Sequence, residues 1–265
     1  RQLLLLRRRR QLVLELLLQF VQQFAPDKTI AWVHDLFTLC PSWTMLRNNV
    51  EFCGGPKLDS VACGICVYGG AERKTHLARL EKVFDALKPD MLFPSEVIKE
   101  FWVARSPLKH TAAKVAPHGT LTMGAAVPTR RKDQLQLRVG FTGLPVYHKG
   151  WYVFEELALR HHQDSRYSFF HFGVNQRDVA RNITFVPVAV DATSRHAMID
   201  ALIANEIDVV VIWSLWYETF SFVAYEAVAA GAFVLAPKEA GNVVPAVSQP
   251  GVEQGMGLES ADQLF

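Results

Sequence analysis

Short β-branched runs alternate with longer helix-forming stretches along most of the chain, and this alternation limits the fold more than any other feature. It is typical of a parallel sheet whose crossover helices cover its faces. The predicted strands are 29–33, 91–93, 114–116, 135–141, 167–172, 183–188, 208–212 and 232–236. The predicted helices are 72–87, 149–161, 194–205 and 219–230, and Ser95 is placed to cap a further helix. The sequence therefore indicates an α/β protein with parallel sheets.

A polar segment separates two regions of this alternation. Residues 120–134 contain Gly124, Pro128 and a charged run, a composition typical of a domain boundary. Residues 135–265 predict an almost complete doubly wound domain, a fold that binds ligands at the carboxyl ends of its strands. Residues 1–125 have too few strands for a full Rossmann unit, so we expect an incomplete one whose start lies outside this sequence. It carries an irregular insert, 36–70.

The N-terminus places the arginine run 7–10 between two leucine-rich stretches. A transmembrane helix needs about 20 mostly apolar residues, so this run excludes one, and a signal peptide would have its charges first. An ordinary helix ending near Pro26 is expected, and a membrane-surface helix using the arginines on anionic lipid is the alternative. The chain starts at Arg1 rather than at methionine, which indicates a fragment or a processed chain. Its net charge of +2 does not indicate a surface that binds nucleic acid.

The loop and helix after the strand 208–212 carry the strongest chemical signal. Glu218 and Glu226 are separated by about 12 Å if both lie on one helix, about the span of a sugar, a diphosphate and a ribose. The amides of Phe220, Ser221 and Phe222 fall at the predicted helix start, where free N–H groups and the helix dipole favour a phosphate. On the residues alone, a solvated helix face explains the two glutamates equally well.

Several segments resemble, in the same order, those of the retaining GT-B glycosyltransferases with an E-x7-E motif (group 1, or family 4). The segments are 139–143 with 148–150 (first strand, glycine loop and phosphate-binding lysine), 218–226 (the motif), 229–235 (helix-to-strand turn) and 241–243 (donor-side loop). They cover roughly residues 135–245, and His34-Asp35 with 117–119 extend the resemblance more loosely. The resemblance implies a GT-B fold, with two Rossmann-like domains, the first incomplete.

The resemblance also implies roles for residues. Glu218 and His34 would be catalytic residues facing the transferred sugar. Glu226 would accept hydrogen bonds from the ribose hydroxyls, and Lys149 would neutralise the diphosphate as the glycosidic bond breaks. The other expected donor-binding residues are Gly143, Phe220 and Ser221. No cofactor or metal would be required for transfer.

The sequence departs from the pattern of this family at three positions. Leu144 stands where the family places an arginine after the first-strand glycine, so one of two expected phosphate cations is absent. Thr219 and Ser221 stand where the family often has glycines. His118 is expected to be a loop residue rather than a catalyst.

All four cysteines of the chain lie in the insert: Cys40, Cys53, Cys63 and Cys66. The Cys63-x-x-Cys66 spacing lets two thiolates reach one ion, and a structural Zn²⁺ would stabilise a segment with little core of its own. Free thiols and two disulfides are the alternatives, and a cytosolic nucleotide sugar argues against disulfides.

These features predict a glycosyltransferase that moves a hexosyl or deoxyhexosyl group from a nucleoside diphosphate sugar, with retention. The acceptor would be a glycan, a lipid-linked acceptor or a protein held by the first domain, and polysaccharide biosynthesis is the expected setting. The expected location is the cytoplasm, with peripheral membrane contact. The alternatives are a non-catalytic nucleotide-sugar-binding module, supported by Leu144, and a GT-B epimerase, which would need further carboxylates in the cleft.

Overall fold

The computed structural model describes residues 15–24, 27–122, 136–177 and 182–265, and the chain divides into two compact units, Arg1–Pro117 and His118–Phe265. Most of the predicted boundary segment, 120–134, lies outside the described residues, as do the arginine run 7–10 and the leucines before it. Residues 15–24 are helical, in the place where a helix ending near Pro26 is expected.

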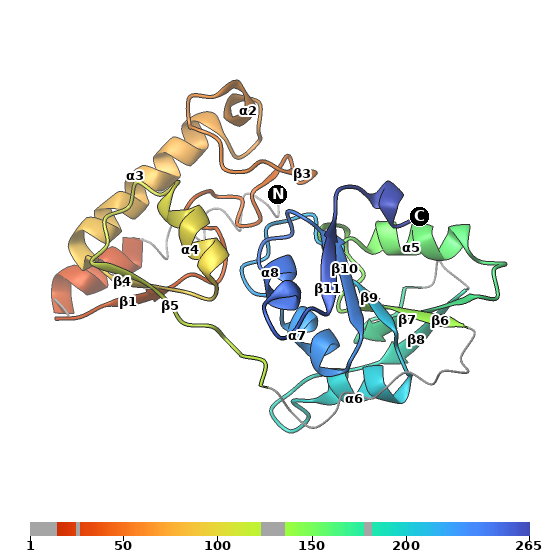
Figure 1. Ribbon diagram of the computed structural model, residues 1–265. Coiled ribbons are helices and arrows are strands. Elements are labelled where there is room, and N and C mark those ends of the chain that lie inside the picture. The colour runs from red at the N-terminus through yellow and green to blue at the C-terminus, as the bar shows by residue number, and fades with distance from the viewer. Residues whose placement is uncertain (1–14, 25–26, 123–135, 178–181) are drawn as a thin grey trace. The chain divides into compact units, whose positions relative to one another are not determined.

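The first unit contains a parallel sheet of β1 (Ile30–Trp32), β4 (Asp90–Phe93) and β5 (Ala112–Val115), in the order β1-β4-β5 (Figure 1). Helix α3 (Gly70–Leu87) precedes β4, and it buries apolar side chains at three- and four-residue spacing: Leu77, Leu80, Val83 and Phe84. Helix α4 (Glu96–Val103) begins after Ser95, whose Oγ accepts a hydrogen bond from the N–H of Ile98. The predicted cap at Ser95 is therefore confirmed.

The insert between β1 and α3 has little regular structure. It contains the antiparallel pair β2 (Leu46–Arg47) and β3 (Glu51–Phe52) and the short helix α2 (Val61–Gly64). The start of the insert is fastened to α4, because the fully buried Trp102 donates from Nε1 to Thr38 Oγ1 over 2.7 Å. The start of the insert is thus fastened to the core of the first unit, and Arg105 and Arg73 fasten its middle by donating to the carbonyl oxygens of Gly54 and Pro56.

The second unit contains a sheet of six parallel strands in the order β11-β10-β9-β6-β7-β8. The strands are β6 (Leu137–Thr142), β7 (Tyr167–Gly173), β8 (Ile183–Pro187), β9 (Val209–Val211), β10 (Phe233–Pro237) and β11 (Gly255–Leu258). From β6 the chain first builds outward to β8, then returns to the other side of β6 and builds outward to β11. This is a doubly wound order, and its direction reverses between β6 and β9, the place where such sheets bind ligands.

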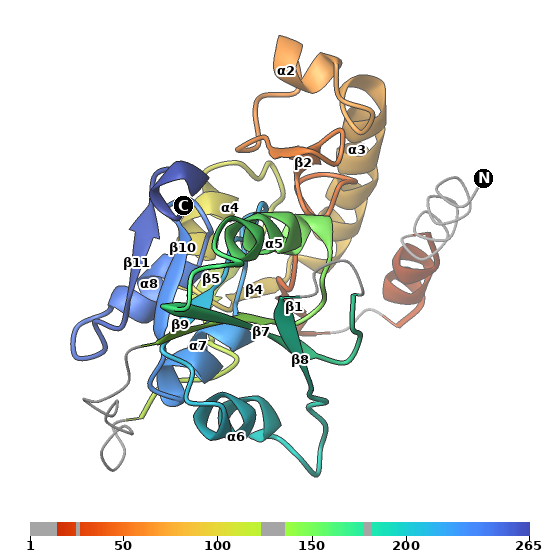
Figure 2. The ribbon, with the colours of Figure 1, turned by 90° about the vertical axis from the view of Figure 1, so that its right-hand side faces the viewer.

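Helices cover both faces of this sheet. Helix α5 (Trp151–Arg160) and the 3₁₀ helix η2 (Ala261–Gln263) lie on one face, and α6 (Ala197–Ala204), α7 (Phe222–Ala229) and α8 (Val243–Ser248) lie on the other (Figures 1 and 2). Neighbouring residues of β9 serve the two faces in turn, since Val210 packs with the α6–α8 side and Val211 packs with α5. The predicted α/β class with parallel sheets is confirmed.

Strand β11 is absent from the sequence-based prediction because it reads Gly-Met-Gly-Leu, which carries no β-branched signal. The structure explains the first glycine, since a Cβ on Gly255 would lie 2.3 Å from Val247 Cγ2 of α8. The close contact between α8 and this edge strand therefore removes the side chains by which a strand is usually identified.

Candidate functional site

The candidate site lies at the carboxyl ends of β6 and β9, where an ion pair joins two loops. Lys149 Nζ, at the end of the 3₁₀ helix η1 (Tyr147–Lys149) after β6, lies 2.7 Å from Glu218 Oε1 in the loop after β9. Ser214 Oγ donates to the same oxygen over 2.5 Å. The side chain of Glu218 is only 6% exposed, whereas that of Lys149 is 35% exposed. The carboxylate of the pair is therefore buried, and its ammonium group is partly exposed to solvent.

Two glycines bring these loops together. Gly150 has φ 79°, and a Cβ there would lie 1.9 Å from the carbonyl oxygen of Trp213, so the chain after Lys149 packs directly on the β9 loop. Gly241 has φ 65°, and a Cβ there would lie 2.4 Å from the Glu218 carbonyl oxygen. That oxygen accepts a hydrogen bond from the N–H of Asn242 at 2.9 Å. Both loops need glycine for the close approach and for the positive φ.

The ammonium group of Lys149 lies against an aromatic ring and beside a histidine. Lys149 Nζ lies 4.7 Å from the centroid of the Trp216 ring, and His148 meets that ring edge-on at 5.5 Å. Burial lowers the pKa of His148, with a further lowering from Lys149 and an opposing effect of Glu218. His148 is therefore neutral at pH 7, and Lys149 provides the charge of this loop.

The start of α7 leaves hydrogen-bond donors unsatisfied. Within the described residues, the N–H groups of Phe220, Ser221 and Phe222 have no acceptor, and Ser221 Oγ is buried without a partner. Asn242 Nδ2 and Thr142 Oγ1, on the neighbouring loop and strand end, are also buried without partners. Buried polar atoms are nearly always hydrogen-bonded in native proteins. Several unpaired polar atoms at the carboxyl end of the sheet therefore indicate that a polar ligand binds there.

Helix α7 begins three residues later than predicted, at Phe222 rather than at 219. Ser221 is extended (φ −107°, ψ 91°), and Glu218 forms a parallel bridge with Gly241. Glu218 therefore lies in an extended loop and not on the helix that carries Glu226. The expected separation of the two carboxylates along one helix axis is wrong for this reason.

Glu226 differs from Glu218 in its surroundings. Its carboxylate makes no hydrogen bond or ion pair with any described residue, and burial raises its pKa above the usual value. A half-buried carboxylate without a partner is costly, because the charged form loses water and gains nothing in return. Glu226 is thus placed to gain from a ligand that donates hydrogen bonds.

Gly143 directly follows β6 with φ 99°, and the exposed Leu144 comes next. The carbonyl oxygen of Gly143 accepts a hydrogen bond from His171 Nε2 at 2.9 Å. His171 is buried, and burial lowers its pKa. The sequence-based prediction includes Gly143 but neither His171 nor Ser214, because their hydrogen bonds cross between strands or loops and leave no local pattern.

The two histidines considered in the sequence analysis lie in different units. His34 is exposed in the first unit, just beyond β1, with its ring stacked on Trp32 at 5.7 Å. His118 lies in a loop of the second unit, as predicted, where its ring stacks on the exposed Phe222 at 5.9 Å.

The four cysteines are free thiols in the insert of the first unit. Burial raises the pKa of Cys40 to about 12, and burial also raises the pKa of Cys53. In the described part of the chain, no three His, Cys, Asp or Glu side chains are arranged so as to hold a metal ion. No helix among the described residues is both long and apolar enough to span a bilayer.

No protein-family model matches the chain, and no curated protein matches it. Similar solved structures include Anabaena Alr3699/HepE in complex with UDP and glucose, with a TM-score of 0.55 and 15% identity over 89% of this chain and 60% of that one. WaaG, a glycosyltransferase involved in lipopolysaccharide biosynthesis, gives 0.54 and 16% over 93% and 69%. TarM gives 0.55 and 12% over 89% and 42%.

These similarities, at identities so low, concern the fold. The chain has the GT-B fold of the glycosyltransferases, with parallel sheets in both units. It spans less than two thirds of the length of TarM and of HepE.

Proposed function

We propose that this chain belongs to a glycosyltransferase and binds a nucleoside diphosphate sugar, from which a hexosyl or deoxyhexosyl group is transferred with retention. The observation that carries the proposal is the Lys149–Glu218 pair beside buried donors that have no acceptor, at the switch point of a doubly wound sheet. The complex of HepE with UDP and glucose supports such ligands for this fold.

The diphosphate is proposed to bind between Lys149 and the start of α7. An ammonium group has three N–H donors, and the contact with Glu218 uses one, so Lys149 can meet a phosphate without leaving its partner. The unpaired amides of Phe220, Ser221 and Phe222 supply further donors at the positive end of the helix. This arrangement assigns the neutralisation of the leaving diphosphate to the protein's own cation and amides.

Glu226 is proposed to accept hydrogen bonds from the two ribose hydroxyls. A carboxylate has two acceptor oxygens and matches a vicinal diol, and this side chain has no partner among the described residues. Ligand binding would therefore supply the hydrogen bonds that burial has removed from this group.

Glu218 is proposed to act first as the positioning residue of Lys149. The buried carboxylate fixes the ammonium group from within, and Ser214 fixes the carboxylate. Its contact with the transferred sugar, and the contact of His34 in the acceptor-side unit, stay proposals from the resemblance.

The acceptor is proposed to be a glycan, a lipid-linked acceptor or a protein in the cytoplasm. Contact with a membrane surface is proposed through the helix 15–24, whose Leu16, Phe20 and Phe24 are each more than half exposed. No metal is assigned a role in the transfer itself.

A non-catalytic nucleotide-sugar-binding module is the second candidate, favoured by Leu144. Its side chain is 48% exposed beside Lys149's loop, at the position where an arginine is expected, and it offers the diphosphate no charge. Both candidates bind the nucleotide, but only the transferase releases it from a sugar donor.

The test uses the intact protein in two measurements. A thermal-shift screen of nucleoside diphosphates and their sugars first identifies the base, and release of nucleotide from the matching donor is then followed with cell extract as the source of acceptor. Binding with release supports the transferase, and binding without release from any donor supports the module. If no nucleotide binds, both candidate functions are contradicted.

A further inference from the structure

Four aromatic side chains gather at the start of α7, beside the unpaired amides. The ring of Phe220 stacks on that of Tyr225, with 4.6 Å between the centroids and 18° between the ring planes. His118 meets Phe220 edge-on at 5.3 Å and lies nearly parallel to Phe222, with 5.9 Å between the centroids and 13° between the planes. Phe220 and Phe222 contact each other at 5.0 Å. We name these four residues the aromatic cluster.

Phe222 is the member of the aromatic cluster that faces solvent. It is 57% exposed, whereas Phe220 behind it is 8% exposed. The segment that carries His118 is held within the second unit, because Leu121 packs against the core of that unit and a Cβ on Gly119 would lie 3.9 Å from Phe220 Cζ. The ring of Phe222 therefore rests on fixed neighbours and presents a flat apolar surface, whose exposure gives up the free energy that burial would provide.

Hydrogen-bond donors without acceptors lie within the same turn of chain. The N–H groups of Phe220, Ser221 and Phe222 have no acceptor among the described residues, and the Oγ of Ser221, a residue only 3% exposed, has no partner there. A ligand that satisfies this place must present oxygen acceptors and, next to them, an apolar face. A pyranose joined to a phosphate has both, because its C–H bonds carry a partial positive charge that suits the negative face of an aromatic ring.

The order of groups along α7 decides which part of the donor meets Phe222. Phe222 and Glu226 are four residues apart and share one face of the helix. The base and the diphosphate are attached at opposite ends of the ribose. With the ribose at Glu226 and the diphosphate at the helix start, the base therefore points away from the helix start. The group that follows the diphosphate is the sugar, so the sugar and not the base comes to Phe222.

We propose that Phe222, supported by His118, stacks on the apolar face of the hexopyranose of the donor. The inference rests on the nucleotide site proposed above and adds a residue that distinguishes the sugar nucleotide from the bare nucleotide. It also restricts the sugar to a pyranose that gathers C–H bonds on one face. The contact holds the sugar against the start of α7 while the amides hold the diphosphate.

The test compares two ligands on Phe222→Ala and Phe222→Tyr in the intact protein. The ligands are UDP with UDP-glucose, GDP with GDP-mannose or dTDP with dTDP-glucose, whichever pair gives the largest thermal shift, and calorimetry measures each Kd. Phe222→Ala should weaken binding of the sugar nucleotide about two- to tenfold and leave the Kd of the bare nucleotide unchanged. Phe222→Tyr keeps the ring and should retain both values. Phe233→Ala, whose ring lies at the start of β10 at the amino end of the sheet, is the control and should change neither.

Two results would overturn the inference: an equal loss of affinity for both ligands, which would assign the ring to the base or the ribose, and no loss for either. In both cases the wild-type protein still binds nucleotide, so the donor site stands. If the wild-type protein binds no nucleotide, the proposed function and this inference fail together.

Saturation-transfer NMR gives a second readout that does not depend on affinity. Irradiation of the aromatic protons should saturate the sugar C–H protons of the bound donor in the wild-type protein and much less in Phe222→Ala, while the ribose signals stay the same. Saturation of the base, with none of the sugar, would contradict the proposed stacking.

Discussion

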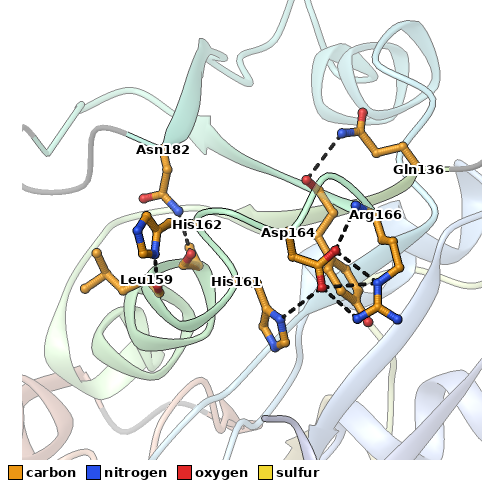
Figure 3. A network of polar contacts seen from close by, with 9 residues as sticks. Gln136, Leu159, His161, His162, Asp164, Arg166 and Asn182 are labelled. Atoms are coloured by element: carbon orange, nitrogen blue, oxygen red, sulfur yellow. Dashed lines mark hydrogen bonds and ion pairs between the residues drawn. The ribbon is translucent and has the colours of Figure 1, made fainter.

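The turn before β7, at the amino end of the six-stranded sheet, differs from the loops at the carboxyl end in how its polar groups are paired. At the amino end, before β7, Asp164 accepts from the N–H, Nε and Nη2 of Arg166 at 2.7–3.1 Å, and Gln136 Nε2 donates to the carbonyl oxygens of Ser165 and Tyr167 (Figure 3). At the carboxyl end, Ser221, Asn242 and Thr142 each bury a polar atom that has no partner among the residues the structure describes. The closed network stabilises a turn, whereas the open one indicates a ligand.

The difference follows from where each network can find its partners. Asp164 and Arg166 are two residues apart, so one turn supplies both charges and needs no ligand. The carboxyl end gathers loops from β6, β9 and β10. Lys149, Glu218 and Ser214 satisfy one another there, but within the described residues other buried polar atoms of these loops have no partner. Substitutions at the two ends should therefore differ in kind: binding and turnover at the carboxyl end, and stability alone at the amino end.

The largest effect is expected for Lys149→Ala on transfer. The positive charge matters most when the diphosphate leaves, so turnover should fall by roughly 100-fold or more, and nucleotide affinity should fall much less. Nucleotide release and calorimetric affinity are measured side by side. Lys109→Ala, which removes an exposed lysine paired with Asp85 in the first unit, is the control and should change neither. Equal losses of affinity and turnover would favour the binding module.

The next effect is expected for Glu226→Gln on nucleotide binding. Loss of a charge-assisted hydrogen bond to ribose costs roughly 1.5–3 kcal/mol, or about ten- to a hundredfold in Kd. The control Glu253→Gln changes an exposed glutamate before β11, at the amino end of the sheet, and should bind normally. An unchanged Kd in Glu226→Gln would remove this residue from the site.

Glu226→Gln is also expected to stabilise the free protein relative to the wild type, by an amount that depends on pH. Burial raises the folded-state pKa of Glu226, so its folded form holds a proton more tightly than the unfolded chain does. Wild-type stability relative to Glu226→Gln is therefore highest below the unfolded pKa and declines as the pH rises through the folded pKa. The Tm of the variant should exceed that of the wild type at pH 7 by more than at pH 4. The reverse trend would show that an unseen partner stabilises the carboxylate.

A smaller effect is expected for Ser221→Ala. Removing a buried hydroxyl that has no partner should leave the Tm unchanged or raise it, while loss of a ligand hydrogen bond of about 1 kcal/mol should weaken nucleotide binding about fivefold. Ser248→Ala is the matched control, because that hydroxyl already donates to the carbonyl oxygen of Val244 and should not affect binding. A marked fall in the Tm of Ser221→Ala would show that its hydroxyl is satisfied in the free protein.

The smallest effect is expected at the amino end, for Asp164→Asn. Hydrogen bonds from Arg166 lower the pKa of Asp164 to about 2, so this carboxylate contributes stability above pH 3.8 that is lost as the pH falls towards 2. The Tm of the variant should lie slightly below that of the wild type at pH 7, and the gap should close towards pH 2. Asp59→Asn, at an exposed position, is the control. A change in the nucleotide affinity of Asp164→Asn would contradict the assignment of ligand binding to the carboxyl end alone.

The sequence predicts most of the parallel strands, because their short runs of β-branched, aromatic and other apolar residues are local signals. It misses β11, whose two glycines serve close packing, and it starts α7 three residues early, because the extended conformation of Ser221 depends on the bridge between Glu218 and Gly241. The pairing of Lys149 with Glu218 joins residues far apart in the chain, and no local pattern encodes it. The sequence thus identifies residues of the candidate site but not which of them satisfy one another.

Hydrogen exchange in the presence of the nucleoside diphosphate that binds tests the central claim most directly. If the carboxyl end of the sheet holds the ligand, peptides covering 143–151 and 214–226 gain protection, because the amides of Phe220, Ser221 and Phe222 acquire an acceptor. Peptides covering the turn 161–166 stay unchanged, because their donors are already satisfied. Protection at that turn, with none at the start of α7, would contradict the account.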